Sequence, residues 1–260
     1  MTEVNLACKE YGEGAPVVIL HGLFGSARNW HSIARRLGER YAVYVLDLRN
    51  HGDSPWADDM DYLALAADVR AFIDRQGLDR PMVIGHSMGG KTAMCLALQH
   101  GERIDRVAVL DIAPVDYDHS HSEFIDAMQM VDPALIERRS EADALLSRTI
   151  PDVPVRQFLL QNLVAQDTNF AWRINLPALS TNLDRILAFP LELADNGGYD
   201  GPALFLHGAN SDYVLPQHVS IIQRLFPRAR YQAVYGAGHW LHAERPDIVL
   251  SALEHFLGKP

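Results

Sequence analysis

Cysteine is scarce in this sequence, which has only two cysteines, Cys8 and Cys95, among 260 residues. Two cysteines cannot supply the several cross-links on which small secreted domains depend, so a disulfide-built domain is excluded. We expect both thiols to be reduced and buried. The N-terminus also lacks a basic segment followed by an apolar one, and no apolar run approaches the roughly 20 residues that cross a membrane. These absences lead us to expect a cytoplasmic protein without stable membrane association.

Positive charge is also in short supply. The chain carries 23 Lys and Arg against 33 Asp and Glu, which gives a formal net charge of −10. Nucleic acids and anionic membrane surfaces attract basic patches, so neither is expected as a main partner. The balance favours a small-molecule substrate. No internal repeat, linker or low-complexity tract interrupts the sequence.

What the sequence does contain is a series of short, continuous apolar runs. Runs of this kind are typical of strands that are buried on both faces of a parallel sheet. Segments with helical spacing separate most of them, which predicts an α/β fold with a doubly wound, mostly parallel sheet. The expected strands are 17–20, 43–46, 82–84, 107–110, 203–206 and 231–235, and the expected helices are 30–40, 63–76, 89–100, 219–226 and 246–257.

One long stretch breaks this alternation. Residues 115–196 contain helical patches at 124–130, 142–149 and 156–166 but no convincing strand. Such a stretch between two strands of one sheet indicates a helical cap inserted over the carboxyl ends of the strands, where α/β folds bind ligands. We therefore expect a core domain formed by residues 1–114 and 197–260, and a cap formed by residues 115–196.

The strongest chemical signal is the sequence Gly-His-Ser-Met-Gly at residues 85–89, which follows an expected strand and opens an expected helix. In a G-x-S-x-G turn the serine adopts a strained conformation, and glycines two residues away on either side avoid a clash with neighbouring backbone. Ser87 is the predicted nucleophile. The amide of Met88, near the helix N-terminus, is a predicted oxyanion donor. A simple glycine-rich turn is the alternative.

A serine hydroxyl needs a neighbouring base, and His239 is the predicted one. It lies in Gly-Ala-Gly-His-Trp at residues 236–240, between the last expected strand and the last expected helix. Near the N-terminus, His-Gly-Leu-Phe-Gly at residues 21–25 follows another strand. The amide of Leu23 is therefore the predicted second oxyanion donor. Taken alone, each of these two glycine-containing segments, residues 21–25 and 236–240, could also be an ordinary turn without a catalytic role.

Six separated motifs make the sequence similar to the α/β-hydrolase superfamily, and more closely to the YbfF-like bacterial esterases and the ABHD11-like hydrolases. They read HGLFGS, DLRNHG, GHSMGGK, LDIAPVDY, GANSDYV and GAGHW. The resemblance covers nearly the whole chain. It implies hydrolysis of short- to medium-chain acyl esters, including thioesters in some relatives, beneath a helical cap.

The resemblance leaves two positions for the catalytic acid. Most of the superfamily carries it after the strand that precedes the histidine, where this chain has Ser211 and then Asp212. The other position follows the strand after the serine, where residues 107–110 lead directly into Asp111. The YbfF-like esterases resemble the second arrangement, with a serine at the position of Ser211 assisting. We favour Asp111 over Asp212, with the carboxylate orienting His239.

The predicted reaction proceeds through an acyl-enzyme on Ser87 and needs no metal or other cofactor. The substrate is expected to be a small ester or thioester. Apolar candidates for its binding pocket are Phe24, Phe124, Met128, Met130, Phe158, Phe170, Trp172 and Trp240. His119 and His121 are expected on a solvated cap loop, and His242 is expected to be structural or exposed.

Several alternatives remain open. Carbon–carbon bond hydrolases and a lyase share the serine and histidine of this fold. Residues 85–92 also satisfy G-x-x-x-x-G-K-[ST], the pattern of a nucleotide-binding loop. That assignment leaves the glycine–histidine motifs at residues 21–22 and 238–239 unexplained, so we expect Lys91 to pair with an acidic group or to lie on the helix surface. A non-catalytic receptor on this fold is the third alternative.

Overall fold

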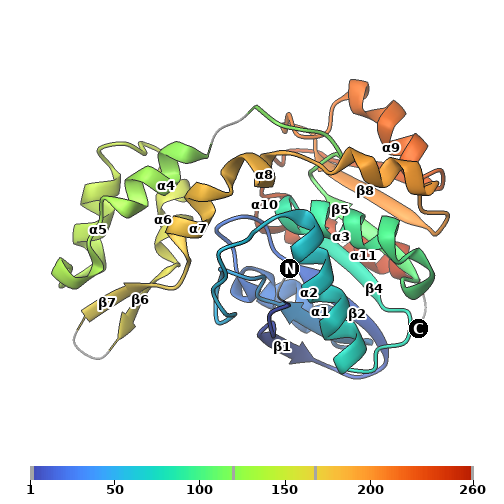
Figure 1. Cartoon of the computed structure of the whole chain (residues 1–260), viewed down its shortest axis with the longest axis horizontal. Helices are drawn as coiled ribbons and strands as arrows, with labels where there is room; N and C mark the ends of the chain where they lie inside the picture. Colours follow the sequence, from blue (N-terminus) through green and yellow to red (C-terminus); the bar gives the residue numbers. More distant parts are fainter. Residues whose placement is uncertain (1–2, 119–120, 167–168, 259–260) are drawn as a thin grey trace.

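A computed structural model describes residues 3–118, 121–166 and 169–258 of the chain. The molecule has two parts, a sheet with helices on both faces and a smaller cap that lies to one side of it (Figure 1). The α/β architecture with a mostly parallel sheet is the predicted one. The cap projects from the carboxyl ends of the central strands, so the crevice between the two parts lies where open α/β sheets bind ligands.

The sheet has seven strands in the order β1-β3-β2-β4-β5-β8-β9. All neighbours pair in parallel except β1 and β3. The strands are β1 (Cys8–Tyr11), β2 (Ala15–Leu20), β3 (Tyr41–Leu46), β4 (Met82–His86), β5 (Arg106–Leu110), β8 (Ala203–Gly208) and β9 (Ala229–Val234). Parallel strands share one carboxyl edge, so the loops that follow β2, β4, β5, β8 and β9 are brought together there.

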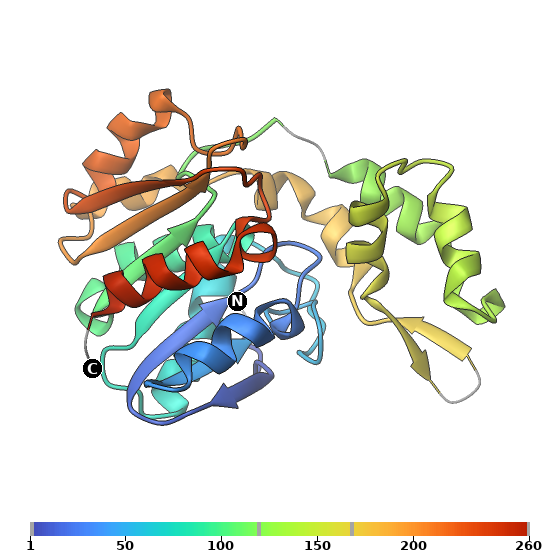
Figure 2. The ribbon, with the colours of Figure 1, turned by 180° about the vertical axis from the view of Figure 1, so that it is seen from behind.

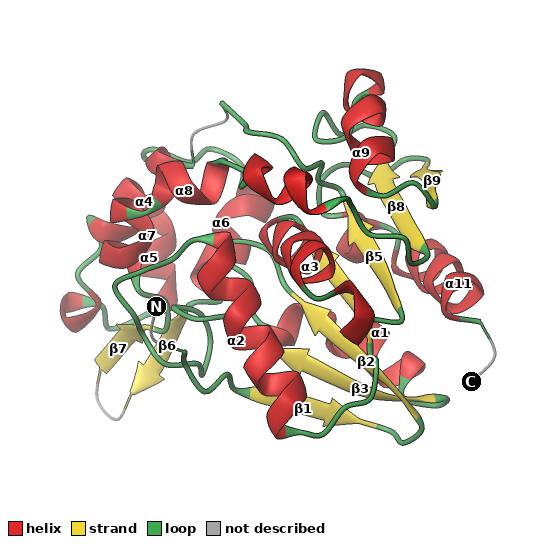
Figure 3. Ribbon diagram, turned by 45° about the vertical axis from the view of Figure 1, so that its right-hand side comes forward, coloured by secondary structure: helices red, strands yellow, loops and turns green. Residues whose placement is uncertain are grey.

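Each central strand is buried on both faces, because side chains alternate between two apolar clusters. In β2, Val18 and Leu20 belong to one cluster, whereas Val17 and Ile19 belong to the other. Figure 3 shows α2 and α3 in front of the sheet, and Figure 2 shows α1 and α11 covering the opposite face. This two-sided burial explains why the strands read as continuous apolar runs.

The helices of the core begin and end close to the predicted bounds. They are α1 (His31–Leu37), α2 (Tyr62–Arg75), α3 (Met88–Gln99), α9 (Val219–Leu225), α10 (Leu241–Glu244) and α11 (Pro246–Leu257). Local signals fix several ends: the Asp61 side chain accepts from the Ala64 amide at the start of α2, and proline is the first residue of α11. Short 3₁₀ helices cover Ala27–Trp30, Gly101–Arg103 and Pro216–His218.

The cap is not purely helical, which corrects the expectation for residues 115–196. Its helices are α4 (Ser122–Gln129), α5 (Arg139–Leu146), α6 (Val153–Leu160), α7 (Leu176–Thr181) and α8 (Leu183–Leu187), with 3₁₀ helices at Pro133–Leu135 and Leu191–Asn196. Two strands, β6 (Leu163–Gln166) and β7 (Asn169–Trp172), pair antiparallel at its far end (Figure 2). The predicted helix over 156–166 was too long because α6 ends at Leu160 and the following residues pair as a strand.

Strand β1 was not predicted. Its residues Cys-Lys-Glu-Tyr carry two charges and form an edge strand, for which a continuous apolar run is not required. Both cysteines are free, but only Cys95 is fully buried, and Cys8 is half-buried on β1. Within the described ranges, no helix is both long enough and apolar enough to cross a membrane.

Candidate active site

Ser87 occupies a sharp turn between β4 and α3, with φ 52° and ψ −117°. A side chain with positive φ is strained, so the surrounding structure must hold it there. The flanking glycines are required by space: a Cβ on Gly85 would lie 2.1 Å from the carbonyl oxygen of Gly89. A Cβ on Gly89 would lie 2.5 Å from the carbonyl oxygens of Leu20 and His21. The turn therefore presents the Ser87 hydroxyl at the carboxyl edge of the sheet.

His239 reaches this hydroxyl from the loop that follows β9. Its Nε2 lies 3.1 Å from Ser87 Oγ, and its Nδ1 lies 2.7 Å from Asp111 Oδ2. The imidazole stacks on the ring of Tyr213 at 3.9 Å between centroids. The His239 carbonyl accepts a hydrogen bond from His86 Nε2 at 2.8 Å. Ring and backbone of His239 are thus both held.

Asp111 lies at the end of β5 and is fully buried. Its Oδ1 accepts from the Gly208 amide at 2.9 Å, and its Oδ2 accepts from the Ser211 hydroxyl as well as from His239. Asp212 is exposed one residue beyond Ser211. Of the two candidate acids, the structure brings Asp111 to His239, and it places Ser211 against the same carboxylate.

This hydrogen-bond pattern fixes the tautomer of His239. An ionised carboxylate only accepts, so Nδ1 carries the proton that is donated to Asp111. Nε2 then presents its lone pair to the Ser87 hydroxyl, as a general base requires. The arrangement can transfer a proton from serine to imidazole while the buried carboxylate stabilises the resulting cation.

The loop after β2 passes directly against the serine turn. A Cβ on Gly22 would lie 2.8 Å from His86 Nδ1 and 3.3 Å from Ser87 Cβ. Leu23 therefore lies beside Ser87, and both residues line the same cavities. Met88 is the first residue of α3, where an amide has no carbonyl partner within the helix. The two predicted oxyanion donors thus flank the serine.

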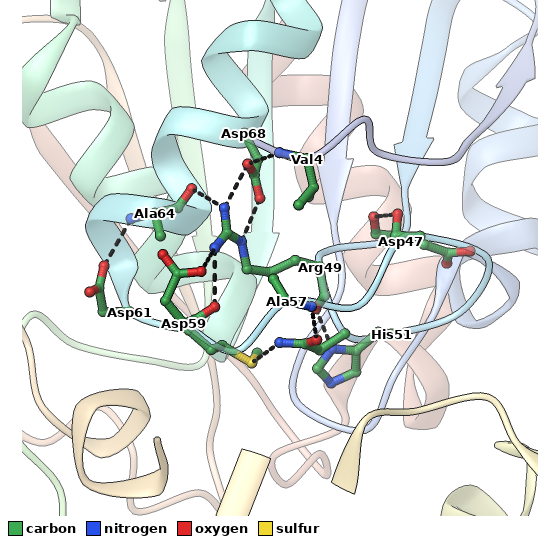
Figure 4. Close-up of polar contacts among 12 residues, drawn as sticks. Val4, Asp47, Arg49, His51, Ala57, Asp59, Asp61, Ala64 and Asp68 are labelled. Atoms are coloured by element: carbon green, nitrogen blue, oxygen red, sulfur yellow. Dashed lines mark hydrogen bonds and ion pairs between the residues drawn. The ribbon is translucent and has the colours of Figure 1, made fainter. Parts of the chain in front are cut away.

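The DLRNHG motif, at residues 47–52, holds the loop after β2 in place through hydrogen bonds. Asp47 accepts from the Ala27 amide at 2.6 Å, and His51 Nε2 accepts from the Phe24 amide at 3.2 Å. Arg49 is fully buried and forms a double contact with Asp68, at 2.6 Å and 2.8 Å (Figure 4). This ion pair anchors the loop after β3 to α2, and that loop in turn positions the loop that carries Leu23.

Two cavities open on Ser87. The larger one is lined by Ser87 and His239 and by four of the predicted substrate-binding residues, namely Phe24, Phe124, Phe158 and Trp240. The smaller one extends along α3 and is lined by Ser87, Met88, Lys91, Tyr117 and Tyr213, among others. Both cavities lie between the sheet edge and the cap.

The other predicted pocket residues lie elsewhere in the cap. Met128 is fully buried in its apolar packing, and Trp172 donates Nε1–H to the carbonyl of Val131. Met130 is 81% exposed, and Phe170 packs beneath the Arg139 guanidinium. Apolar character alone did not separate side chains that pack the cap on itself from those that face the crevice.

Lys91 and His121 lie differently from the sequence-based expectation, whereas His242 has one of its two expected placements, a buried structural one. Among the residues that the structure describes, Lys91 is neither on the surface nor at ion-pair distance from an acid: it is 1% exposed and donates to the carbonyls of Leu187 and Ala188. His121 lines both cavities rather than a solvated loop, whereas His119 lies outside the described residues. His242 is buried, stacks on Trp30 at 4.8 Å, and lines the larger cavity.

Two contacts of His239 were also missed, although the sequence held signals for both. His86 is the variable residue before the serine in the G-x-S-x-G turn, and Tyr213 is the sixth residue of the motif GANSDYV. Each lies within two residues of a predicted site residue. In the ranges that the structure describes, no group of three or more His, Cys, Asp or Glu side chains is arranged to hold a metal ion.

Comparison with known proteins agrees with this geometry. Residues 15–246 match the family model described as alpha/beta hydrolase fold. The sn-1-specific diacylglycerol lipase ABHD11 of Mus musculus is 44% identical over 249 residues, which cover 93% of this chain and 80% of the relative. Esterase YbfF of Escherichia coli is 39% identical over 244 residues, which cover 94% and 93% of the two chains. The chain belongs to the α/β-hydrolase family.

A solved structure of an esterase has the same fold. The structure titled "Marine microorganism esterase" superposes with a TM-score of 0.92 at 39% identity, and the match covers 98% of this chain and all of the other. Since the relatives are named as esterases and a lipase, the chain is a hydrolase of the carboxylesterase type.

Proposed function

We propose that this enzyme hydrolyses carboxylic esters of short to medium acyl chains, thioesters included, through an acyl-enzyme on Ser87. The observation that carries the proposal is the continuous contact from Ser87 through His239 to Asp111, at 3.1 Å and 2.7 Å. A serine hydroxyl, a correctly oriented imidazole and a buried carboxylate are the groups that acyl transfer requires.

In the first half-reaction the Ser87 Oγ attacks the ester carbonyl carbon, while His239 Nε2 takes the hydroxyl proton. The carbonyl oxygen becomes an oxyanion and accepts hydrogen bonds from the amides of Leu23 and Met88. Collapse of this intermediate breaks the bond to the alcohol oxygen, which leaves with the proton from His239. A water molecule then repeats the sequence on the acyl-enzyme, releases the acid and restores Ser87.

The position of His239 supports a proposed placement of the two parts of the substrate in the two cavities. His239 must protonate the leaving oxygen, and it lines the larger cavity but is not among the residues that line the smaller one. The alcohol or thiol part therefore belongs in the larger cavity. The acyl part belongs in the smaller cavity.

Labelling with a fluorophosphonate probe tests the nucleophile. The wild-type enzyme should be labelled and should hydrolyse p-nitrophenyl butyrate, whereas Ser87→Ala should lose labelling and at least about 10⁴-fold in kcat/KM. Ser220→Ala, which changes an exposed serine on α9, is the matched control and should behave as wild type. Undiminished labelling of Ser87→Ala would remove the assignment.

A substrate panel tests the reaction class. It should contain p-nitrophenyl esters of increasing acyl length, the corresponding acyl thioesters, a diacylglycerol, as the mouse relative's name suggests, and a vinylogous diketone. We expect the highest kcat/KM on an ester or thioester with a short or medium acyl group. Faster cleavage of the diketone would favour the carbon–carbon bond hydrolases instead.

A further inference from the structure

Lys91 is a buried cation that the acyl-transfer mechanism does not use. It lies one helical turn after Ser87 on α3, and its backbone amide donates to the Ser87 carbonyl. Helical side chains lean toward the N-terminus of their helix, so the lysine stem is directed back toward the serine end of α3. Its Nζ donates to the Leu187 carbonyl at 2.7 Å and to the Ala188 carbonyl at 2.8 Å.

The surroundings of Nζ place it at the wall of the smaller cavity. The ammonium lies 4.8 Å from the ring centroid of Tyr117 and 5.4 Å from that of Tyr62. Lys91, both tyrosines and Leu187 all line this cavity, which opens at its other side on Ser87. An ammonium has three N–H donors, and within the described residues two of them are used by carbonyls.

Lys91 also lacks a carboxylate partner at ion-pair distance among the residues that the structure describes. Asp116 is near enough to act on it electrostatically, but its Oδ1 accepts from the Phe189 amide at 2.7 Å. Burial outweighs this attraction and lowers the pKa of Lys91 to about 7. A buried charge without a counter-ion is costly, so an anionic group that enters the cavity would be stabilised.

We propose that the smaller cavity accepts acyl groups that end in a carboxylate, and that Lys91 selects them by binding this carboxylate. The substrates would be half-esters or half-thioesters of short dicarboxylic acids, with the scissile carbonyl at Ser87 and the free carboxylate at Lys91. A single ammonium neutralises a single carboxylate, whereas a phosphate dianion would leave a second charge against tyrosine rings. The inference rests on the proposed function, since it uses the acyl side of that site.

The test compares charged and neutral esters of the same length. Benzyl hydrogen succinate, glutarate and adipate are paired with benzyl butyrate, valerate and hexanoate, and benzyl alcohol is measured by chromatography at pH 6.5. For at least one length the wild-type kcat/KM should be about tenfold higher for the charged ester. Lys91→Met should remove this preference, so that the charged-to-neutral ratio falls at least about tenfold.

The charged-to-neutral ratio of kcat/KM distinguishes a loss of substrate selection from a loss of folded enzyme. Both kcat/KM values come from one preparation, so the folded fraction cancels even where loss of the contacts to Leu187 and Ala188 loosens the cap. Lys9→Met is the matched control, because it removes the same charge from β1 at the far edge of the sheet. Its ratio should equal that of wild type.

A pH series on the wild type gives a measurement that needs no variant. The ratio should fall as the pH rises from 6 to 8.5, because the ammonium loses its proton while the substrate stays ionised. His239 acts on both esters and cancels. The other titratable groups that act on Lys91 are Asp116 and Cys95, and the rings of Tyr62 and Tyr117 face it.

Three outcomes would overturn the inference. A wild type that hydrolyses the neutral esters but prefers no carboxylate-ended length would refute it and leave the proposed function intact. A preference that survives in Lys91→Met would assign the selection to another group. Hydrolysis of neither ester series would overturn the proposed function together with the inference.

Discussion

The sheet edge and the cap contribute to the same site in different ways. Ser87, His239 and Asp111 come from loops after β4, β9 and β5, and each is held by backbone geometry or by several hydrogen bonds. The cap contributes apolar side chains such as Phe124 and Phe158. Under the proposed function, the sheet edge determines which reaction occurs, and the cap together with the smaller cavity determines which substrates react.

Polar contacts connect the two parts at many points. Asn162 Nδ2 donates to the Phe24 carbonyl at 2.8 Å, and Asn175 donates to the Asn50 side chain at 2.9 Å. Lys91 donates to two cap carbonyls, Tyr62 donates to the Ile186 carbonyl, and Asn182 donates to the Asp58 carbonyl. These contacts hold the cap in place, but the groups proposed to react lie at the sheet edge. Substitutions at the sheet edge should therefore lower kcat, whereas substitutions in the cap should mainly change KM and substrate preference.

The largest effect on kcat is expected from substitution of Asp111. Asp111→Asn should lower kcat about 10³–10⁴-fold, because the amide cannot stabilise the imidazolium and disturbs the tautomer of His239. KM for p-nitrophenyl butyrate should change little. Steady-state kinetics of the purified variants would measure both values.

The matched control is Asp212→Asn, which makes the same change on the exposed neighbour. It should retain at least about half of the wild-type kcat. If Asp212→Asn were the more damaging of the two, the acid would have to be reassigned and His239 would have to move on substrate binding.

The same comparison explains what the sequence could predict. The chemistry of the sheet edge depends on backbone that few residue types tolerate, so glycine at 85 and 89 and the strand before Ser87 are visible as a motif. Asp111 was favoured over Asp212 only through the resemblance to esterases, because both aspartates follow a strand. The order of the strands, which places β5 beside β4 and β9 two strands beyond β5, is not evident from any local pattern.

The cap was predicted less well for a physical reason. Its helices are short, and apolar positions serve internal packing as well as the crevice, so Met128 and Phe158 look alike in sequence. The hairpin β6–β7 is short, and the helical patch that precedes it extends the same apolar pattern. Lys91 was misplaced because a lysine on a helix usually reaches solvent, and only the tertiary structure shows that the cap covers it.

A second, smaller effect concerns stability of the sheet edge in acid. Burial lowers the pKa of His51 and of His242 to about 3, far below the value near 6.5 of the unfolded chain. Between these values the unfolded chain binds more protons, so the free energy of unfolding falls as the pH falls below 6.5. Each histidine should remove about 2 kcal/mol between pH 7 and pH 5.

Urea unfolding of variants at both pH values would measure this loss. His242→Phe should lose about 2 kcal/mol less than wild type over the interval, because one buried titrating group is gone. His255→Phe, which changes an exposed histidine on α11, should leave the loss as in wild type. Equal losses in all three proteins would mean that acid acts through other groups.

The smallest predicted effect is in the cap, and it tests whether cap residues change only substrate binding. Phe158 is half-buried on α6 and packs on Trp240 at 5.7 Å in the wall of the larger cavity. Phe158→Ala should raise KM for 2-naphthyl butyrate about three- to tenfold by removing apolar contact with the alcohol part, with kcat within about twofold. Ethyl butyrate, which is too small to reach this wall, should be affected less.

Met130→Ala is the control, because it truncates an exposed side chain of the same cap away from the cavity, and neither constant should change. If Phe158→Ala lowers kcat on both esters without a change in KM, the proposed separation between a reacting sheet edge and a substrate-binding cap is wrong. That result would mean that the ring of Phe158, through Trp240, helps to hold His239 against Ser87. The cap would then take part in acyl transfer itself, and differences in cap sequence among related enzymes would alter rate as well as preference.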